Sequence, residues 1–267
     1  MAIFVFAWRR LASLKRLVTS LKKAEYCGAK RAAGRLSLTF LLDTGASPAV
    51  EAYVRGVRWP YGPVRVAQEP PGAPARGIRG MWIDAMAREL EANEPPTAHL
   101  LPLEDDVELS PLWYWWLRRA HNAYGPFDAA SGVGPTWGRD VAEGARQLVG
   151  VSLYTPRLDE IAYPSRHWRP RWPSMAGSAP AFLFELPCSW GALFFRDYWR
   201  RFLRFYAQRG SPPFYNASYE PFQQGKLAAR EVLGDRALAI ANSRASTWPR
   251  SWKRFLIDYM YGRGALG

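Results

Sequence analysis

The sequence has few of the residues that disulfide frameworks and zinc sites require. Its 2 cysteines, Cys27 and Cys188, allow at most one disulfide and cannot form a Cys-rich zinc site. Its 3 histidines, His99, His121 and His167, have no His or Cys partner at metal-ligand spacing. We therefore interpret each histidine as a packed or surface residue, and we do not expect a zinc centre.

Long hydrophobic runs are also missing. A membrane-spanning helix needs roughly 20 consecutive apolar residues, whereas the longest run near the N-terminus, Ala2 to Trp8, stops at Arg9. No charged leader or small-residue cleavage site marks a signal peptide. We expect the run to be a buried strand and not an anchor.

Acidic residues are scarce, with 23 Asp and Glu against 36 Lys and Arg, for a net charge of +13. Such a charge suits phosphate-bearing ligands, nucleic acid or anionic membrane surfaces, or it simply aids solubility. The chain is 48% hydrophobic and holds 13 each of Trp, Tyr and Phe. That content excludes a disordered basic tail and is enough for a large core.

Strand-like and helix-like patterns alternate along the first hundred residues. Four short apolar runs are typical of buried strands: residues 2–8, 36–42, 63–67 and 98–103. Apolar residues at helical spacing follow the first run (11–21) and the third (78–90), while Ser47 and Pro48 supply an N-cap and a first-turn proline after the second. Repeated units of this kind predict an α/β fold with a mostly parallel sheet sandwiched by helices.

The second half is less regular. Its patterns predict helices over 112–124, around 199–206 and over 252–261, strands at 150–154 and 189–195, and a long proline-rich loop at 155–180. The aromatic run Trp113 to Trp116 lies within the first of these helices, and we interpret it as core and not as a sugar platform.

Charged residues follow three of the predicted strands. Arg9 and Arg10 follow the first, Asp43 follows the second, and the acids of residues 104–106 follow the fourth. Ligands of parallel sheets bind beyond the carboxyl ends of the strands, so we expect these residues to meet in one crevice. Consecutive carboxylates there can hold a divalent cation together with phosphate oxygens. A solvated acidic turn before the next helix is the alternative.

The run Leu103-Glu104-Asp105-Asp106-Val107-Glu108-Leu109-Ser110-Pro111 resembles the metal-binding signature of GT-A nucleotide-sugar glycosyltransferases. It is most similar to the family 2-like enzymes and to the N-acetylglucosaminyltransferase I group. The resemblance implies a single Rossmann-like GT-A domain, with residues 1–110 as the nucleotide-sugar-binding half and 111–267 as the acceptor-binding half. The chain ends soon after the last predicted helix, which leaves a C-terminal truncation open.

The same resemblance implies roles for the acids. Asp106 would coordinate Mn²⁺ or Mg²⁺ bridging the donor diphosphate, while Glu104 and Asp105 would face the ribose and the sugar. Asp43 would contact the nucleotide, as would an arginine after the first strand. Arg9 and Arg10 both remain candidates for that arginine.

Two further segments carry candidates. Arg76 and Arg79 lie in a Gly- and Pro-rich loop, where they either contact phosphate or sugar or belong to a solvated loop. The segment 184–195 resembles the acceptor side of the family. Glu185 matches the family's catalytic base, with Glu in place of Asp, or it is merely structural. Trp190 lies beside a loop and is a candidate for stacking on the sugar.

These features predict a metal-dependent, inverting glycosyltransferase that moves a sugar from a nucleoside diphosphate to a carbohydrate or glycoconjugate acceptor. One alternative is a nucleic-acid-binding protein, which the scattered basic residues and the lack of a recognition motif disfavour. Another is a non-catalytic carbohydrate-binding relative. We expect a cytoplasmic location by default, or a Golgi-type enzyme without its anchor; membrane association stays open.

Overall fold

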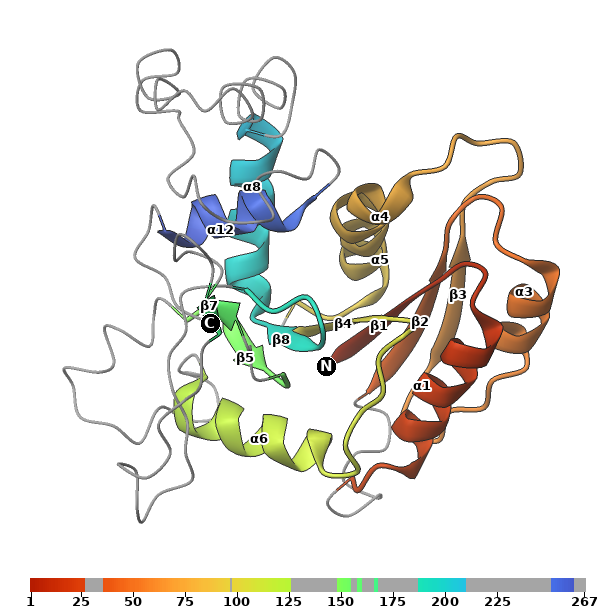
Figure 1. Ribbon diagram of the computed structural model, residues 1–267, viewed down its shortest axis with the longest axis horizontal. Coiled ribbons are helices and arrows are strands. Elements are labelled where there is room, and N and C mark those ends of the chain that lie inside the picture. Colours follow the sequence, from red (N-terminus) through yellow and green to blue (C-terminus); the bar gives the residue numbers. More distant parts are fainter. Residues whose placement is uncertain are drawn as a thin grey trace.

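The fold is mixed α/β, with one six-stranded sheet flanked by helices (Figure 1). The computed structural model describes residues 1–26, 36–96, 98–125, 148–154, 158–159, 166–167, 187–209 and 251–261. The predicted mostly parallel, Rossmann-like sheet between helices is confirmed. The division at residue 110 into donor and acceptor halves stays a prediction.

The sheet has the strand order β3-β2-β1-β4-β8-β5. Its strands are β1 (Ala2–Ala7), β2 (Ser37–Leu42), β3 (Val64–Gln68), β4 (Leu100–Glu104), β5 (Gly150–Ser152) and β8 (Ala192–Phe194). The first four are parallel, and β8 runs antiparallel to its neighbours β4 and β5. Separately, β6 (Leu158–Asp159) and β7 (Arg166–His167) form a two-stranded antiparallel sheet.

The helices follow the predicted pattern closely. They are α1 (Leu11–Lys23), α3 (Pro48–Arg55), α4 (Gly77–Gly80), η1 (Met81–Ala85), α5 (Met86–Asn93), α6 (Trp113–Tyr124), α8 (Arg196–Arg209) and α12 (Lys253–Tyr261). As predicted, Ser47 caps α3 by accepting a hydrogen bond from the Val50 backbone N–H, and Pro48 occupies the first turn. Within the described ranges, no helix is long and apolar enough to cross a membrane.

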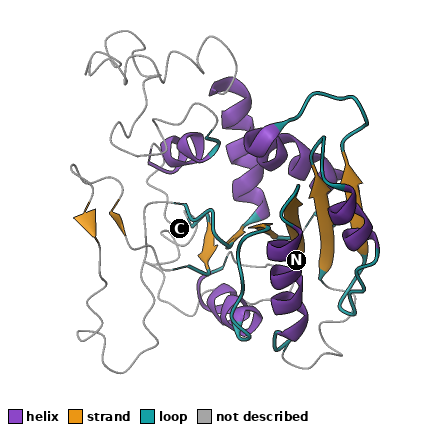
Figure 2. Cartoon of the chain, turned by 45° about the vertical axis from the view of Figure 1, so that its right-hand side comes forward, coloured by secondary structure: helices purple, strands orange, loops and turns teal. Residues whose placement is uncertain are grey.

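The connections decide which face each helix covers. From β1 to β2 and on to β3, the chain moves across the sheet in one direction. Because crossover connections between parallel strands are right-handed, helices α1 and α3 lie on the same face. The step from β3 back to β4 reverses direction and puts α4, η1 and α5 on the other face (Figures 1 and 2). On that second face Trp82 packs against Phe6, with ring centroids 4.9 Å apart, and stacks on Trp252 at 4.0 Å.

Helix α6 lies beside the end of α1. The Ser20 hydroxyl accepts a hydrogen bond from the Leu109 backbone N–H at 3.1 Å. Trp113 and Tyr114 of α6 are buried, which agrees with the interpretation of the aromatic run as core. That interpretation is wrong for Trp115, which is 44% exposed because it lies on the outer side of α6.

Two of the histidines form a pair that their sequence positions did not indicate. Nε2 of His99, next to β4, lies 3.0 Å from Nε2 of His121 in α6. Nδ1 of His99 accepts a hydrogen bond from the Arg196 backbone N–H, so neutral His99 carries its proton on Nε2 and donates it to His121. Burial, followed by the charge of His121, lowers the pKa of His99 to about 4.

Candidate functional site

The candidate site lies where the parallel strands end. Strands β1, β2, β3 and β4 end in register at one edge of the sheet, and the residues that follow them gather there. The chain reverses its stepping direction between β1 and β4, which makes this edge a topological switch point. Loops after adjacent strands diverge at such a point and leave a crevice for ligands.

Arg10, after β1, bridges two acids after β4. Its guanidinium lies 2.5 Å from Oδ1 of Asp105 and 2.6 Å from Oδ2 of Asp106. The Asp105 side chain is 4% exposed and that of Asp106 is 44% exposed. Burial raises the pKa of Asp105, although hydrogen bonds from Arg10 and from the Trp8 backbone act against the rise. Arg10 therefore offsets a buried negative charge and leaves Asp106 facing solvent.

Glu104, the first acid of the predicted motif, has a raised pKa. Burial, followed by the charge of Asp106, raises its pKa to about 7, although Arg10 acts in the opposite direction. Near neutral pH Glu104 therefore exists in both protonation states. In the protonated state it can donate a hydrogen bond to a ligand, and in the ionised state it can only accept.

Arg9 turns away from the acids. Its Nε donates to the Gly45 carbonyl oxygen at 3.2 Å, and its guanidinium lies 4.1 Å from the centre of the Trp8 ring. Gly45 has φ +78°, a conformation that favours glycine, and so lets the loop after β2 turn back toward β1. Of the two arginine candidates, Arg10 is the one that meets the acids.

Asp43, after β2, is held by backbone N–H groups. Its carboxylate accepts hydrogen bonds from Thr44 at 2.8 Å, from Arg76 at 3.0 Å and from Gly77 at 2.8 Å. These bonds fasten the loop before α4 over the end of β2. The predicted contact of Asp43 with a nucleotide would have to share this carboxylate with the loop, and it stays a prediction.

Glu69, after β3, belongs to the same edge but was missed from the sequence. Its side chain is 4% exposed and forms ion pairs with Arg76 at 2.8 Å and with Arg88 at 2.6 Å. Burial acts to raise the pKa of Glu69, but the hydrogen bonds and charges of the two arginines outweigh it and lower the pKa. The available signal was its position directly after a strand, the same signal that singled out Asp43.

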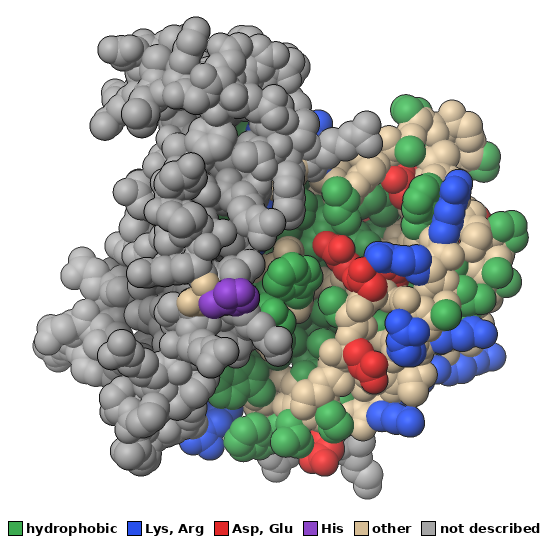
Figure 3. All heavy atoms as spheres, in the orientation of Figure 1, with side chains coloured by type: hydrophobic (Ala, Val, Ile, Leu, Met, Phe, Trp, Pro, Cys, Tyr) green, Lys and Arg blue, Asp and Glu red, His purple; other side chains and the backbone are tan. Residues whose placement is uncertain are grey.

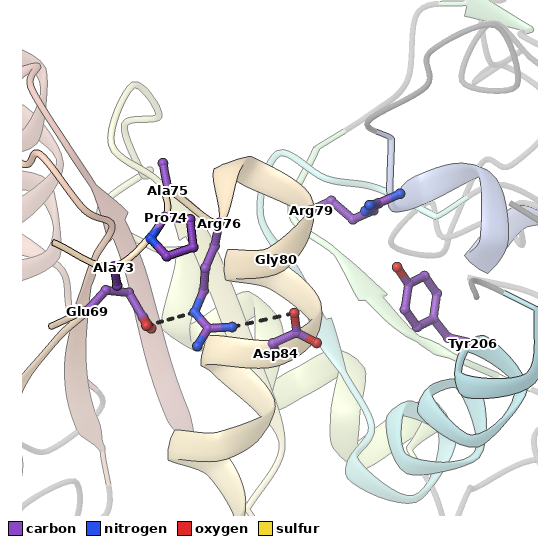
Figure 4. A pocket seen from close by; sticks show the side chains of 9 residues that line it. All are labelled: Glu69, Ala73, Pro74, Ala75, Arg76, Arg79, Gly80, Asp84 and Tyr206. Atoms are coloured by element: carbon purple, nitrogen blue, oxygen red, sulfur yellow. Dashed lines mark ion pairs between the residues drawn. The ribbon is translucent and has the colours of Figure 1, made fainter. Parts of the chain in front are cut away.

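A pocket of about 320 Å³ opens beside the ion pair of Glu69 and Arg76 (Figure 4). Arg76 reaches across it from Glu69 to Asp84, whose carboxylate lies 3.7 Å from the Arg76 guanidinium. Arg79 and Tyr206 face each other across the other part of the pocket, from α4 and α8 (Figure 4). Arg76 thus belongs to an ion-pair cluster, and the alternative of a purely solvated loop does not hold for it.

Trp190 lies at the same edge through the antiparallel strand β8. Because β8 runs against β4, the start of β8 lies beside the end of β4, and Gly191 comes close to Leu103. The Trp190 side chain is 51% exposed, and its ring meets Tyr154 edge-on with centroids 5.0 Å apart. Glu185, the candidate base, lies outside the described residues.

A cation at the acids after β4 would have to be shared with a ligand. No group of three or more His, Cys, Asp or Glu side chains able to hold a metal occurs in the part of the chain that the structure describes. Asp106 supplies one exposed carboxylate, which also contacts Arg10 at 2.6 Å, while Asp105 is buried against the same arginine. Mg²⁺ is commonly held by one or two carboxylates plus substrate phosphates. Asp106 suits that kind of site better than one built from protein ligands alone.

Comparisons with known proteins show only a distant structural likeness. No protein-family model and no curated protein matches it. Among solved structures, the crystal structure of TarS 1–349 from S. aureus aligns with a TM-score of 0.33 and 13% identity, over 46% of this chain and 32% of that chain. A likeness this distant assigns neither a family nor an activity.

Proposed function

We propose that the chain is a glycosyltransferase that binds the diphosphate of a nucleotide-sugar at the switch point between β1 and β4. The observation that carries the proposal is the convergence of Arg10 with Asp105 and Asp106 at this edge. The acidic motif's resemblance to the GT-A signature supplies the reaction class. The donor base, the sugar and the carbohydrate or glycoconjugate acceptor are left open.

Transfer of a sugar builds negative charge on the departing diphosphate. Arg10 is half exposed and can turn one edge of its guanidinium to a phosphate while it keeps its contact with buried Asp105. Asp106 would hold Mn²⁺ or Mg²⁺, which when bound neutralises diphosphate charge as a Lewis acid. Glu104, whose pKa is raised to about 7, would hydrogen-bond a donor hydroxyl.

Two residues of the segment 184–195 complete the proposal, Trp190 for the sugar and Glu185 for the acceptor. The exposed ring of Trp190, braced edge-on by Tyr154, offers a flat apolar surface against which a sugar ring can pack. Glu185 is proposed, from the sequence resemblance, as the base that takes the proton of the acceptor hydroxyl in an inverting displacement.

Thermal unfolding with nucleotide-sugars tests the donor site. Titrating UDP- and GDP-sugars with and without Mn²⁺ should raise the Tm of the wild type most when both are present, since a ligand that binds only the folded state stabilises it. Asp106→Asn should abolish the Mn²⁺-dependent part. Glu108→Gln, an exposed acid two positions along the same loop, is the matched control and should behave as wild type. Equal shifts in the two variants would contradict the proposed metal ligand.

A transfer assay tests the base. Glu185→Gln should lose transfer while it keeps the donor-induced Tm shift, and retained turnover would remove Glu185 from the mechanism. If the wild type binds the donor but neither transfers the sugar nor hydrolyses the donor, the result would favour the non-catalytic relative. Salt-sensitive binding of nucleic acid, with no response to any nucleotide-sugar, would favour the nucleic-acid alternative.

A further inference from the structure

The outer surface of α1 and α6 combines exposed apolar side chains with cations. Leu112, which directly precedes α6, and Trp115, in its first turn, are 49% and 44% exposed. Arg118 and Arg119 lie one turn further along α6, and the Arg119 guanidinium lies 5.5 Å from the centre of the Trp115 ring. Helix α6 buries Trp113 and Leu117 on its inner side, so Leu112 and Trp115 are left at the surface.

The last turn of α1 lies near the start of α6. Lys22 and Lys23 are exposed there, and the chain after them is tied to the start of α6 by the Glu25 backbone N–H, which donates to the Pro111 carbonyl oxygen at 2.8 Å. Figure 3 shows hydrophobic side chains gathered over α6 with basic side chains at either end. We call the surface formed by the following six residues the α1–α6 surface: Lys22, Lys23, Leu112, Trp115, Arg118 and Arg119.

We propose that the α1–α6 surface docks the protein onto an anionic lipid bilayer. Lys and Arg side chains are attracted to the negative headgroups, and an indole and an aliphatic side chain can enter the interfacial region. Glu25 and Glu108 are the exposed acids at its rim, and the cations outnumber them. A half-exposed leucine beside the cations favours lipid over nucleic acid, which offers phosphates and base faces but no hydrocarbon layer.

The geometry keeps this surface apart from the proposed donor site. Helix α1 begins beyond the carboxyl end of β1 and runs back along the sheet, so Lys22 and Lys23 lie toward the opposite edge from Arg10 (Figure 1). Docking through the α1–α6 surface therefore leaves the carboxyl edge open. Membrane binding and donor binding can be measured and disrupted separately.

Two matched pairs of variants test the proposal by co-sedimentation with vesicles. In the first pair, the test variant carries Arg118→Gln and Arg119→Gln together. Its control carries Arg201→Gln and Arg204→Gln on α8, which lowers the net charge by the same amount on another helix. The apolar pair is Leu112→Ala against Ile78→Ala, since Ile78 is 43% exposed on α4. Every variant alters an exposed side chain, and unchanged Tm values would show that it folds.

Wild type should sediment with vesicles of equal parts phosphatidylcholine and phosphatidylglycerol and not with phosphatidylcholine alone. The Arg118/Arg119 variant should bind about thirtyfold more weakly, and Leu112→Ala about tenfold more weakly. The two controls should stay within about threefold of wild type. Absence of binding to the anionic vesicles, or equal losses in test and control variants, would overturn the proposal. Release of the wild type from the vesicles on addition of an RNA or DNA duplex would also overturn the proposal.

Discussion

The guanidinium of Arg10 lies 2.5 Å from the carboxylate of Asp105, and this contact joins the end of β1 to the end of β4. The same guanidinium holds Asp106 at 2.6 Å. The two strands are neighbours in the sheet but are separated in the chain by three crossover connections. One arginine thus compensates the charge of the buried Asp105 carboxylate and joins the two strand ends.

Removing Arg10 should destabilise the fold through Asp105. In Arg10→Ala the buried carboxylate keeps the Trp8 backbone N–H but loses its compensating charge. We expect the free energy of unfolding in urea at pH 7 to fall by about 1–3 kcal/mol. Because burial raises the pKa of Asp105, the loss should shrink as the pH falls and Asp105 takes up a proton. Arg9→Ala, which removes an exposed contact with Gly45, should cost less than about 0.5 kcal/mol; equal losses would show that Asp105 does not depend on Arg10.

Glu104 should make the fold less stable as the pH rises. Its pKa is about 7 in the folded protein against a usual 4.5, so between these values the folded state holds a proton that the unfolded state has released. Stability therefore falls from about pH 4.5 to about pH 7, by up to about 3 kcal/mol. Urea unfolding of Glu104→Gln across that window should lack this decline and show greater stability than wild type at pH 8. A wild-type slope in the variant would contradict the raised pKa.

The His99–His121 pair should act in the opposite direction. The pKa of His99 is lowered to about 4 from a usual 6.5, so between these values the unfolded state binds a proton that folded His99 does not. The stability linked to His99 is present above pH 6.5 and is lost as the pH falls toward 4. Nitrogen NMR should show neutral His99 protonated on Nε2 throughout this range. Uptake of a proton by His99 at the ordinary histidine pKa of 6.5 would contradict the pair.

Gly150 should tolerate no side chain. A Cβ at this position of β5 would collide with the carbonyl oxygen of Leu193 in β8, so the two strands would have to part. We expect Gly150→Ala to lower the free energy of unfolding by more than about 2 kcal/mol. Gly56→Ala is the control, because a Cβ there meets the Tyr53 carbonyl oxygen at an ordinary 3.5 Å, and it should change stability by less than about 0.5 kcal/mol. Similar losses in both would show that close packing is not the cause.

The elements were readable from the sequence because their signals are local. The apolar run at residues 2–8 matches β1, and the Ser47-Pro48 pair marks the start of α3 as predicted. Boundaries shifted where the local signal was weak: the strand predicted at 98–103 is β4 over Leu100–Glu104, and the one predicted at 189–195 shortens to Ala192–Phe194. A short strand flanked by further apolar residues has no sharp sequence mark at its ends.

The sequence alone determined the alternating β-α order and the placement of charged residues just after the strands, because hydrophobic periodicity and chain order are properties of neighbouring residues. Only the tertiary structure decided which partners those residues meet. It turned Arg10 toward the acids and Arg9 toward Gly45, tied Asp43 to the loop before α4, and joined His99 to His121. These contacts depend on strand order and on the reversal between β1 and β4, which join segments far apart in the chain.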